Sequence, residues 1–263
     1  MGVVDTVRPP AVAGTFYPGS PGELRSTVDR LLGDVTAPAG PCPKALIVPH
    51  AGYIYSGPIA ASAFARIAPY ADRIQKIVLV GPAHRVFVDG LAAPAATRLA
   101  TPLGESVIDV EAVRRIGLAT NAAAHAREHS LEVQLPFLQR VAPHATIVPI
   151  CGSRATPETV GAMLDALWGG PETLIVISSD LSHYLPYATG RAVDQATCDR
   201  IVAREPTLLG EQACGAIGIN GLLWVARKRN LRIELVDLRS SGDTAGSRDE
   251  VVGYAAFAIY EEA

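Results

Sequence analysis

The sequence lacks the features that mark membrane, exported and nucleotide-binding proteins. No apolar run approaches the ~18–20 residues that a membrane-spanning helix needs. The chain starts Met-Gly-Val-Val-Asp-Thr-Val-Arg-Pro-Pro, which contains no apolar signal core, so export is not expected. Neither a Gly-x-Gly-x-x-Gly stretch nor a Walker loop is present, which argues against a nucleotide site.

Cysteine is scarce and dispersed. The chain has 4 cysteines, at positions 42, 151, 198 and 214, and none belongs to a Cys-x-x-Cys pair. This spacing argues against a disulfide scaffold and against a closed zinc cluster of cysteines. We therefore expect a cytoplasmic protein in a reducing compartment, with most of its cysteines buried as apolar side chains.

The chain also has no large excess of basic or of acidic residues. The 23 Lys and Arg against 26 Asp and Glu give a net charge of −3, which leaves no electrostatic footprint for nucleic acid. With 263 residues, 49% of them hydrophobic and 19% charged, the chain is long and apolar enough to bury a sizeable core. No linker or repeat divides it, so we expect one domain over residues 1–263.

Short, continuous apolar runs predict the strands. Most of them lack polar alternation, which is typical of strands covered on both faces. The expected strands are Ala45–Val48, Ile77–Val80, Leu91–Ala93, Thr146–Ile150, Leu174–Ile177, Ile233–Leu238 and Val251–Tyr260. The last two should pair as an antiparallel hairpin around a polar turn.

Helical patterns alternate with these strands. A capping residue followed by proline begins two helices, at Ser20-Pro21 and at Thr156-Pro157. The other expected helices are Ile59–Ile67, Val110–Ile116, Leu131–Val141, Ala192–Ala203 and Ala216–Arg229. Pro136 lies inside one of them and should kink it. This alternation predicts an α/β fold with a largely parallel sheet.

Three of the expected strands deliver a histidine just past their carboxyl ends. These are His50, His84 and His183, among only 6 histidines in the chain. Because the carboxyl ends of parallel strands share one edge of a sheet, where α/β proteins place their sites, we expect the three to converge. Neutral imidazole is the commonest metal ligand and suits iron, copper or zinc, so the pattern indicates a metal site.

The residues alone leave the third, anionic ligand open. Asp180, Glu128, Cys151 and Cys214 all qualify, and spacing slightly favours Cys151 because it too follows a strand. Two histidines and one anion form a facial set that leaves positions for substrate or oxygen. Asp180 and His183 share a loop, and could instead form a carboxylate–imidazole pair for proton transfer.

The remaining histidines give weaker signals. His125 and His129 are four residues apart, as in helical zinc hydrolases, but Ala-Arg-Glu separates them instead of the Glu-x-x of that motif. A zinc-dependent hydrolase is therefore only a third alternative. His144 follows a proline in a turn and should be exposed to solvent.

Seven motifs occur in the order in which they occur in a known family. They are Ala13-Gly14-Thr15-Phe16-Tyr17-Pro18, Pro49-His50-Ala51-Gly52-Tyr53, Gly81-Pro82-Ala83-His84, Glu128-His129-Ser130-Leu131-Glu132, Ser178-Ser179-Asp180-Leu181-Ser182-His183, Cys214-Gly215 and Val252-Gly253-Tyr254-Ala255. From about Pro10 onward the chain resembles the Memo family, whose bacterial and archaeal members are also called system protein B of the AmmeMemoRadiSam group. That family resembles class III extradiol ring-cleaving dioxygenases, which implies a three-layer α/β/α sandwich with a largely parallel mixed sheet.

The resemblance also implies one mononuclear metal site. His50 and His84 match the two histidine ligands, and Cys214 matches the third, which is a glutamate in the ring-cleaving enzymes. His183 matches their catalytic acid–base histidine, and Asp180 matches a carboxylate beside it. Protonated histidines around Cys214 would lower the pKa of its thiol and leave a reactive thiolate in the metal-free protein.

The function that this implies is a non-haem, dioxygenase-like oxidoreductase acting on a small, unidentified substrate. Iron(II) is the expected metal, with copper or zinc as alternatives. The substrate should contact Tyr53, Glu128, His129 and Tyr184. The alternative is a metal- or peptide-binding protein that uses the same pocket without turnover, because animal relatives are described as signalling adaptors that bind phosphorylated peptides and metal. Neither a nucleic acid nor a membrane partner is expected.

Overall fold

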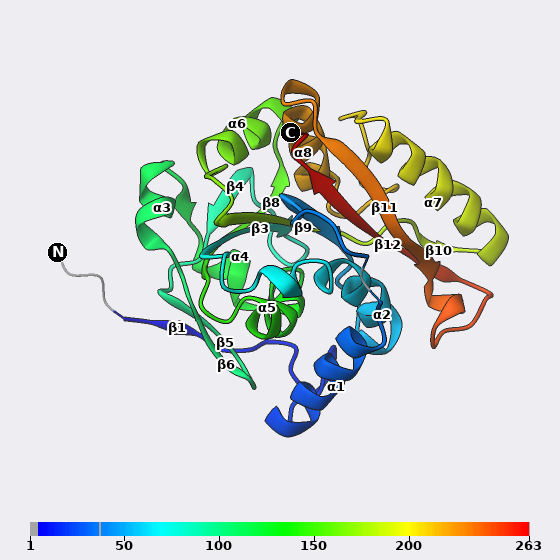
Figure 1. Cartoon of the computed structure of the whole chain (residues 1–263), viewed down its shortest axis with the longest axis horizontal. Coiled ribbons are helices and arrows are strands. Elements are labelled where there is room, and N and C mark those ends of the chain that lie inside the picture. The colour runs from blue at the N-terminus through cyan, green and yellow to red at the C-terminus, as the bar shows by residue number, and fades with distance from the viewer. Residues whose placement is uncertain (1–4, 37, 263) are drawn as a thin grey trace.

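Nine strands of the computed structural model, which describes residues 5–36 and 38–262, form one mixed sheet (Figure 1). They are β2 (Ala45–Val48), β3 (Lys76–Pro82), β4 (Gly90–Ala93), β7 (Ala119–Thr120), β8 (Thr146–Arg154), β9 (Thr173–Ser178), β10 (His183–Leu185), β11 (Arg232–Ser240) and β12 (Val251–Tyr260). Their order is β10-β12-β2-β9-β3-β8-β4-β7, and β11 also pairs with β12. All seven expected strands are present, most of them longer than the apolar runs by one to four residues.

The central strands β2, β9, β3 and β8 are parallel, and they fix where the site lies. Every residue of β2 and of β9 is buried, which explains their uninterrupted apolar runs. β11 and β12 form the expected antiparallel hairpin, with Arg232 opposite Tyr260. Because β2, β3 and β9 run in one direction, their carboxyl ends meet at one edge of the sheet.

Helices cover both faces of the sheet, as the three-layer expectation requires (Figure 1). On one side lie α1 (Pro21–Gly33), α2 (Tyr53–Phe64) and α5 (Leu135–Val141), and on the other α6 (Pro157–Ala166), α7 (Tyr187–Val202) and α8 (Ala216–Lys228). The shorter elements are α3 (Val110–Arg115), α4 (Ala122–Ala126), η1 (Ala68–Tyr70), η2 (Glu132–Gln134), η3 (Ser241–Asp243) and a small sheet of β1 (Val7–Arg8), β5 (Arg98–Thr101) and β6 (Gly104–Val107).

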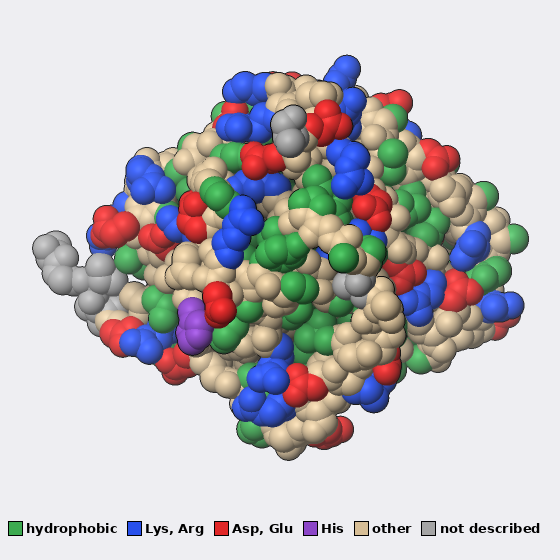
Figure 2. Space-filling view, viewed as in Figure 1, with side chains coloured by type: hydrophobic (Ala, Val, Ile, Leu, Met, Phe, Trp, Pro, Cys, Tyr) green, Lys and Arg blue, Asp and Glu red, His purple; other side chains and the backbone are tan. Residues whose placement is uncertain are grey.

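Two observations concern surface charge and membrane-spanning helices. Acidic and basic side chains are interspersed over the face shown in Figure 2, without a broad area of one sign. Within the described part of the chain, no helix is both long and apolar enough to span a bilayer.

Three helix starts differ from the predicted ones: α7 begins at Tyr187, five residues before the expected Ala192, and the positions of two prolines explain the other two. α2 begins at Tyr53, six residues before the expected start, because Pro58 is tolerated inside the helix. Pro136 lies in the first turn of α5, where its missing N–H costs nothing, so it starts a helix instead of kinking one. α1 begins at Pro21, as expected, although the Ser20 side chain makes no cap, and Thr156 accepts a hydrogen bond from the Thr159 N–H at the start of α6.

A buried carboxylate ties the N-terminal segment to the loop before α5. Glu132 accepts hydrogen bonds from the Val12 N–H at 3.0 Å and from the Tyr17 hydroxyl at 2.6 Å. It also pairs with Arg8, whose Nη2 donates to the Glu128 carbonyl at 2.6 Å. This network places residues 8–17 directly against the Glu128–Glu132 segment, which carries part of the candidate site.

Candidate metal centre

Three side chains from separate elements converge at the carboxyl edge of the parallel strands. One nitrogen of His50, one of His84 and the sulfur of Cys214 all lie within 4.8 Å of one another. His50 and His84 follow β2 and β3, whereas Cys214 precedes α8. Gly215 permits this approach, because a Cβ there would collide with the Ser178 carbonyl at the end of β9.

The hydrogen bonds of His50 determine which of its ring nitrogens is free. Its Nδ1 lies 2.9 Å from Ser178 Oγ, and the Ser178 hydroxyl donates its one proton to the Ser130 carbonyl at 2.6 Å. Ser178 Oγ must therefore accept from His50, which places the ring proton on Nδ1. The unprotonated Nε2 lies 3.3 Å from Cys214 Sγ, in the orientation that a metal ligand needs.

Glu128 orients His84 in the same way. Its Oε1 lies 2.9 Å from His84 Nδ1, and its Oε2 accepts the His84 backbone N–H at 2.6 Å. Burial alone would raise the pKa of Glu128, but hydrogen bonds from His84 and from the Ser130 N–H outweigh it and hold the pKa well below its usual range. The carboxylate can only accept, so His84 carries its proton on Nδ1 and leaves Nε2 free. With 29% of its side chain exposed, His84 also faces solvent.

Cys214 is a protonated thiol when no cation is present. Burial, reinforced by the nearby Asp180 carboxylate, raises the pKa of the thiol to about 12. The reactive thiolate expected from neighbouring histidines is therefore wrong, because burial lowers the pKa of His50 to about 3 and keeps that ring neutral. The Asp180 N–H points at Sγ from 3.3 Å, which would stabilise a thiolate once a cation has displaced the proton.

Asp180 lies on the loop that follows β9, and His183 is the first residue of β10. Asp180 Oδ1 accepts the His50 N–H at 2.7 Å, and its Oδ2 lies 4.0 Å from His50 Nε2. Burial raises the pKa of Asp180. His183 is half-buried and packs edge-on against Tyr184, whose left-handed φ of 56° leaves that ring 71% exposed. Tyr184 therefore lies at the surface beside the site.

His129 forms a third imidazole of the cluster. Its ring stacks on His84, with centroids 4.7 Å apart, and packs edge-on against His50 at 5.4 Å. Phe16, which no sequence pattern marked as a site residue, packs against it with ring centroids 4.7 Å apart. His129 Nδ1 is buried and has no hydrogen-bond partner among the described residues. The Glu-His-Ser motif thus supplies both the carboxylate that orients His84 and the ring that packs against it.

Other candidates lie apart from this group. The Tyr53 hydroxyl donates to the Val133 carbonyl at 2.7 Å, and its ring packs against Phe137 in the core. Cys151 Sγ lies 3.2 Å from His125 Nε2 in a separate buried contact. α4 ends at Ala126, so His125 and His129 do not share a helix face. His144 is exposed, as expected.

Comparison with known proteins gives one consistent result. The pattern of the Memo-like protein family matches residues 8–258. A MEMO1 family protein of Archaeoglobus fulgidus is 37% identical over 265 residues, which cover 95% of this chain and 98% of the relative. One from Aquifex aeolicus is 37% identical over 267 residues, which cover 94% of this chain and 97% of the relative. Another, from Caldivirga maquilingensis, is 33% identical over 289 residues, which cover 97% of this chain and 99% of the relative.

Proposed function

Since this chain belongs to the Memo-like protein family, we propose that it binds one transition-metal ion through His50, His84 and Cys214 and uses it as a dioxygenase-like oxidoreductase. Iron(II) is the proposed metal, with copper or zinc as the alternatives, and the proposed substrate is a small molecule. The observation that carries the proposal is the pair of imidazoles whose Nδ1 atoms are both hydrogen-bonded, which leaves two Nε2 lone pairs beside one sulfur.

The donor set fits a single ion. Metal–nitrogen and metal–sulfur bonds of about 2.0–2.1 and 2.3 Å place two ligands of one ion roughly 3–4 Å apart. His50 Nε2 and Cys214 Sγ, at 3.3 Å, already satisfy that requirement. Imidazole suits iron, copper and zinc, whereas a thiolate adds affinity for softer ions. Three protein ligands on one side would leave positions for other molecules.

The protein side chains would handle binding and protons. A bound iron(II) would supply the electrons that dioxygen activation requires. Asp180, held by the His50 N–H, and His183, at the start of β10, would take and return protons near the substrate. Tyr184 at the surface and His129 beside both ligands would contact the substrate. We assign Tyr53 a structural role in place of substrate contact, because its hydroxyl donates a hydrogen bond to the Val133 carbonyl.

Metal analysis and oxygen uptake together test this proposal. Protein purified under nitrogen and reconstituted with iron(II), copper(I) or zinc should retain one ion per chain. The iron form should consume oxygen with at least one member of a catechol and phenol panel, and the zinc form should not. Stoichiometric metal with no oxygen uptake on any substrate would instead favour the alternative, a metal- or peptide-binding protein without turnover.

Glu128→Gln should weaken metal binding by about 10–100-fold, the usual cost of losing the partner that orients a metal-binding histidine. The amide can donate to His84 Nδ1, which would move the ring proton to Nε2 and block that lone pair. Titration calorimetry with iron(II) under nitrogen measures the effect. Glu105→Gln, an exposed change on β6, is the matched control, and equal affinity of the two variants would contradict the orienting role.

Changing Cys214 separates metal affinity from chemistry. Cys214→Ser should weaken iron(II) binding, because a hydroxyl is a poor substitute for a thiolate. Cys214→Glu restores the carboxylate of a two-histidine, one-carboxylate set, so oxygen uptake with a catechol should appear or rise. Measured oxygen uptake that falls in Cys214→Glu while one iron remains bound would argue against latent ring-cleaving chemistry.

A further inference from the structure

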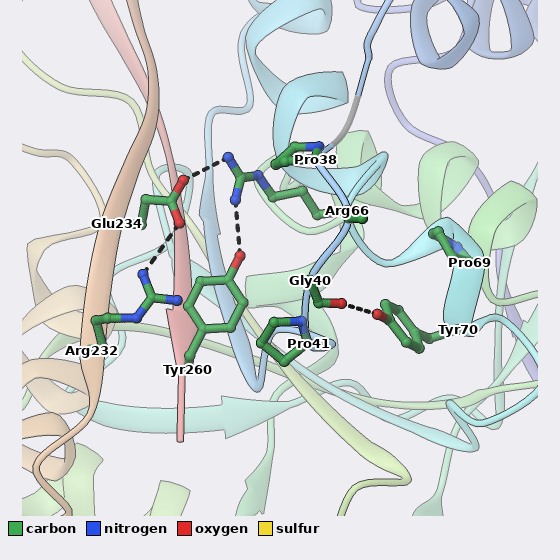
Figure 3. Close-up of a pocket in the computed structure, with 10 residues that line it drawn as sticks. Pro38, Gly40, Pro41, Arg66, Pro69, Tyr70, Arg232, Glu234 and Tyr260 are labelled. Carbon is green, nitrogen blue, oxygen red and sulfur yellow. Dashed lines mark hydrogen bonds and ion pairs between the residues drawn. The ribbon is translucent and has the colours of Figure 1, made fainter. Parts of the chain in front are cut away.

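A cavity of about 730 Å³ is shown in Figure 3. Its residues 38–41 precede β2, whereas His50 follows that strand. Residues 38–41, η1 and the hairpin β11–β12 surround it. The side chains that matter to its chemistry are Pro41, Arg66, Tyr70, Arg232, Glu234 and Tyr260. The proposed function uses none of them.

The fold holds the walls of this cavity in place. Arg232 and Glu234 are two residues apart on β11 and therefore share a face of the sheet, and Tyr260 on β12 pairs opposite Arg232. The Arg232 guanidinium covers the Tyr260 ring at 4.3 Å. Across the cavity the Tyr70 hydroxyl donates to the Gly40 carbonyl, which fixes the loop before β2 (Figure 3). A preformed cavity of this kind costs a ligand little ordering entropy.

The charges in the cavity do not balance. Glu234 is shared between Arg66, at 2.7 Å, and Arg232, at 3.4 Å, so two guanidinium groups face one carboxylate. Arg66 Nη1 also donates to the Tyr260 hydroxyl at 2.9 Å. One positive charge therefore remains uncompensated, and the guanidinium of Arg232, 48% exposed, is the one that a ligand can reach.

We propose that this cavity binds a small monocarboxylate that carries a flat ring. A single uncompensated positive charge matches one carboxylate, whereas Glu234 in the wall would repel a phosphate dianion. The Tyr70 ring and the flat side of Pro41 supply apolar surface for the ring of the ligand. The volume lies within the range of sites for small molecules.

This site is independent of the metal centre. Pro41 precedes β2 and His50 follows it, so they lie beyond opposite ends of a strand whose four residues alone span roughly 13 Å at about 3.3 Å each. A carboxylate in this cavity would not reach His50, so the proposal stands whether or not the protein binds metal.

Benzoate is the probe, and NMR of the full-length protein is the measurement. Benzoate should bind with a millimolar dissociation constant and shift the Arg232 Nε–H resonance and the amides of Arg232 and Glu234. Benzyl alcohol, which has the ring without the charge, and phenyl phosphate, a dianion, should each bind at least tenfold more weakly. Equal binding of either compound, or shifts confined to the His50 and Cys214 surroundings, would overturn the proposal.

Variants that remove a positive charge and one that removes the negative charge should have opposite effects on binding. Arg232→Gln, at a half-exposed position that tolerates change, should weaken benzoate binding at least tenfold, and Arg66→Gln should do the same. Glu234→Gln should strengthen the binding of phenyl phosphate, because it removes the repelling carboxylate. Arg25→Gln, an equal charge change on the exposed side of α1, should leave binding unchanged. Unaltered benzoate binding in Arg232→Gln, or no gain for phenyl phosphate in Glu234→Gln, would refute the assignment.

Discussion

His50→Ala is expected to lower iron(II) affinity by more than about 100-fold, beyond the 10–100-fold typical of losing an outer partner. The variant removes one of three donors, and it frees Ser178 and Cys214 from their contacts with the ring. His84→Ala should have a similar effect, because its Nε2 is the second free imidazole nitrogen. Titration calorimetry under nitrogen, with metal content after desalting as a second readout, measures both losses.

The control for these variants comes from the structure. His144→Ala should bind iron(II) like the unaltered protein, since His144 is exposed and remote from the cluster. His125→Ala is a poorer control, because His125 is buried, hydrogen-bonds the Ala92 carbonyl at 3.0 Å and contacts Cys151. If His50→Ala retained one tightly bound iron per chain, the ion would have to lie elsewhere, and the ligand set proposed above would be wrong.

Glu132→Ala should destabilise the protein by about 3–5 kcal/mol, the usual cost of removing one partner of a buried ion pair. The change would leave the Arg8 guanidinium buried without its carboxylate, and it would leave the Val12 N–H and the Tyr17 hydroxyl without an acceptor. For a domain of this size the expected fall in melting temperature is roughly 6–20 °C. Thermal unfolding followed by circular dichroism is the measurement.

Glu111→Ala provides the comparison for that prediction. Glu111 pairs with Arg114 on the surface of α3, where both side chains are more than half exposed, so its loss should cost less than about 1 kcal/mol. The double variant Arg8→Met with Glu132→Leu should be more stable than Glu132→Ala, because neither charge of the buried pair then remains in the interior. Equal melting temperatures for Glu132→Ala and Glu111→Ala would show that the buried network contributes little.

Much of the fold was predictable because periodicity and strand burial are local properties. Continuous apolar runs identified the strands from Ala45 to Tyr260, and the alternation with helices gave the α/β class. The same runs placed His50 and His84 at one edge, because parallel strands end together. Family motifs then supplied Cys214, which spacing alone ranked below Cys151. The helix starts at Tyr53 and Leu135 were missed, since the cost of a proline depends on which turn it occupies.

The sequence by itself determined the class of fold, the edge at which the site lies and the residue types that converge there. Only the tertiary structure decided what each of them does. It put Cys214 beside His50 but Cys151 beside His125, and it turned Glu128 into the partner that sets the His84 tautomer. It also made Cys214 a protonated thiol and brought Arg66, Arg232 and Glu234 around one cavity. The reason is physical: tautomers, pKa values and charge balance depend on burial and on partners far apart in the chain, which no local pattern encodes.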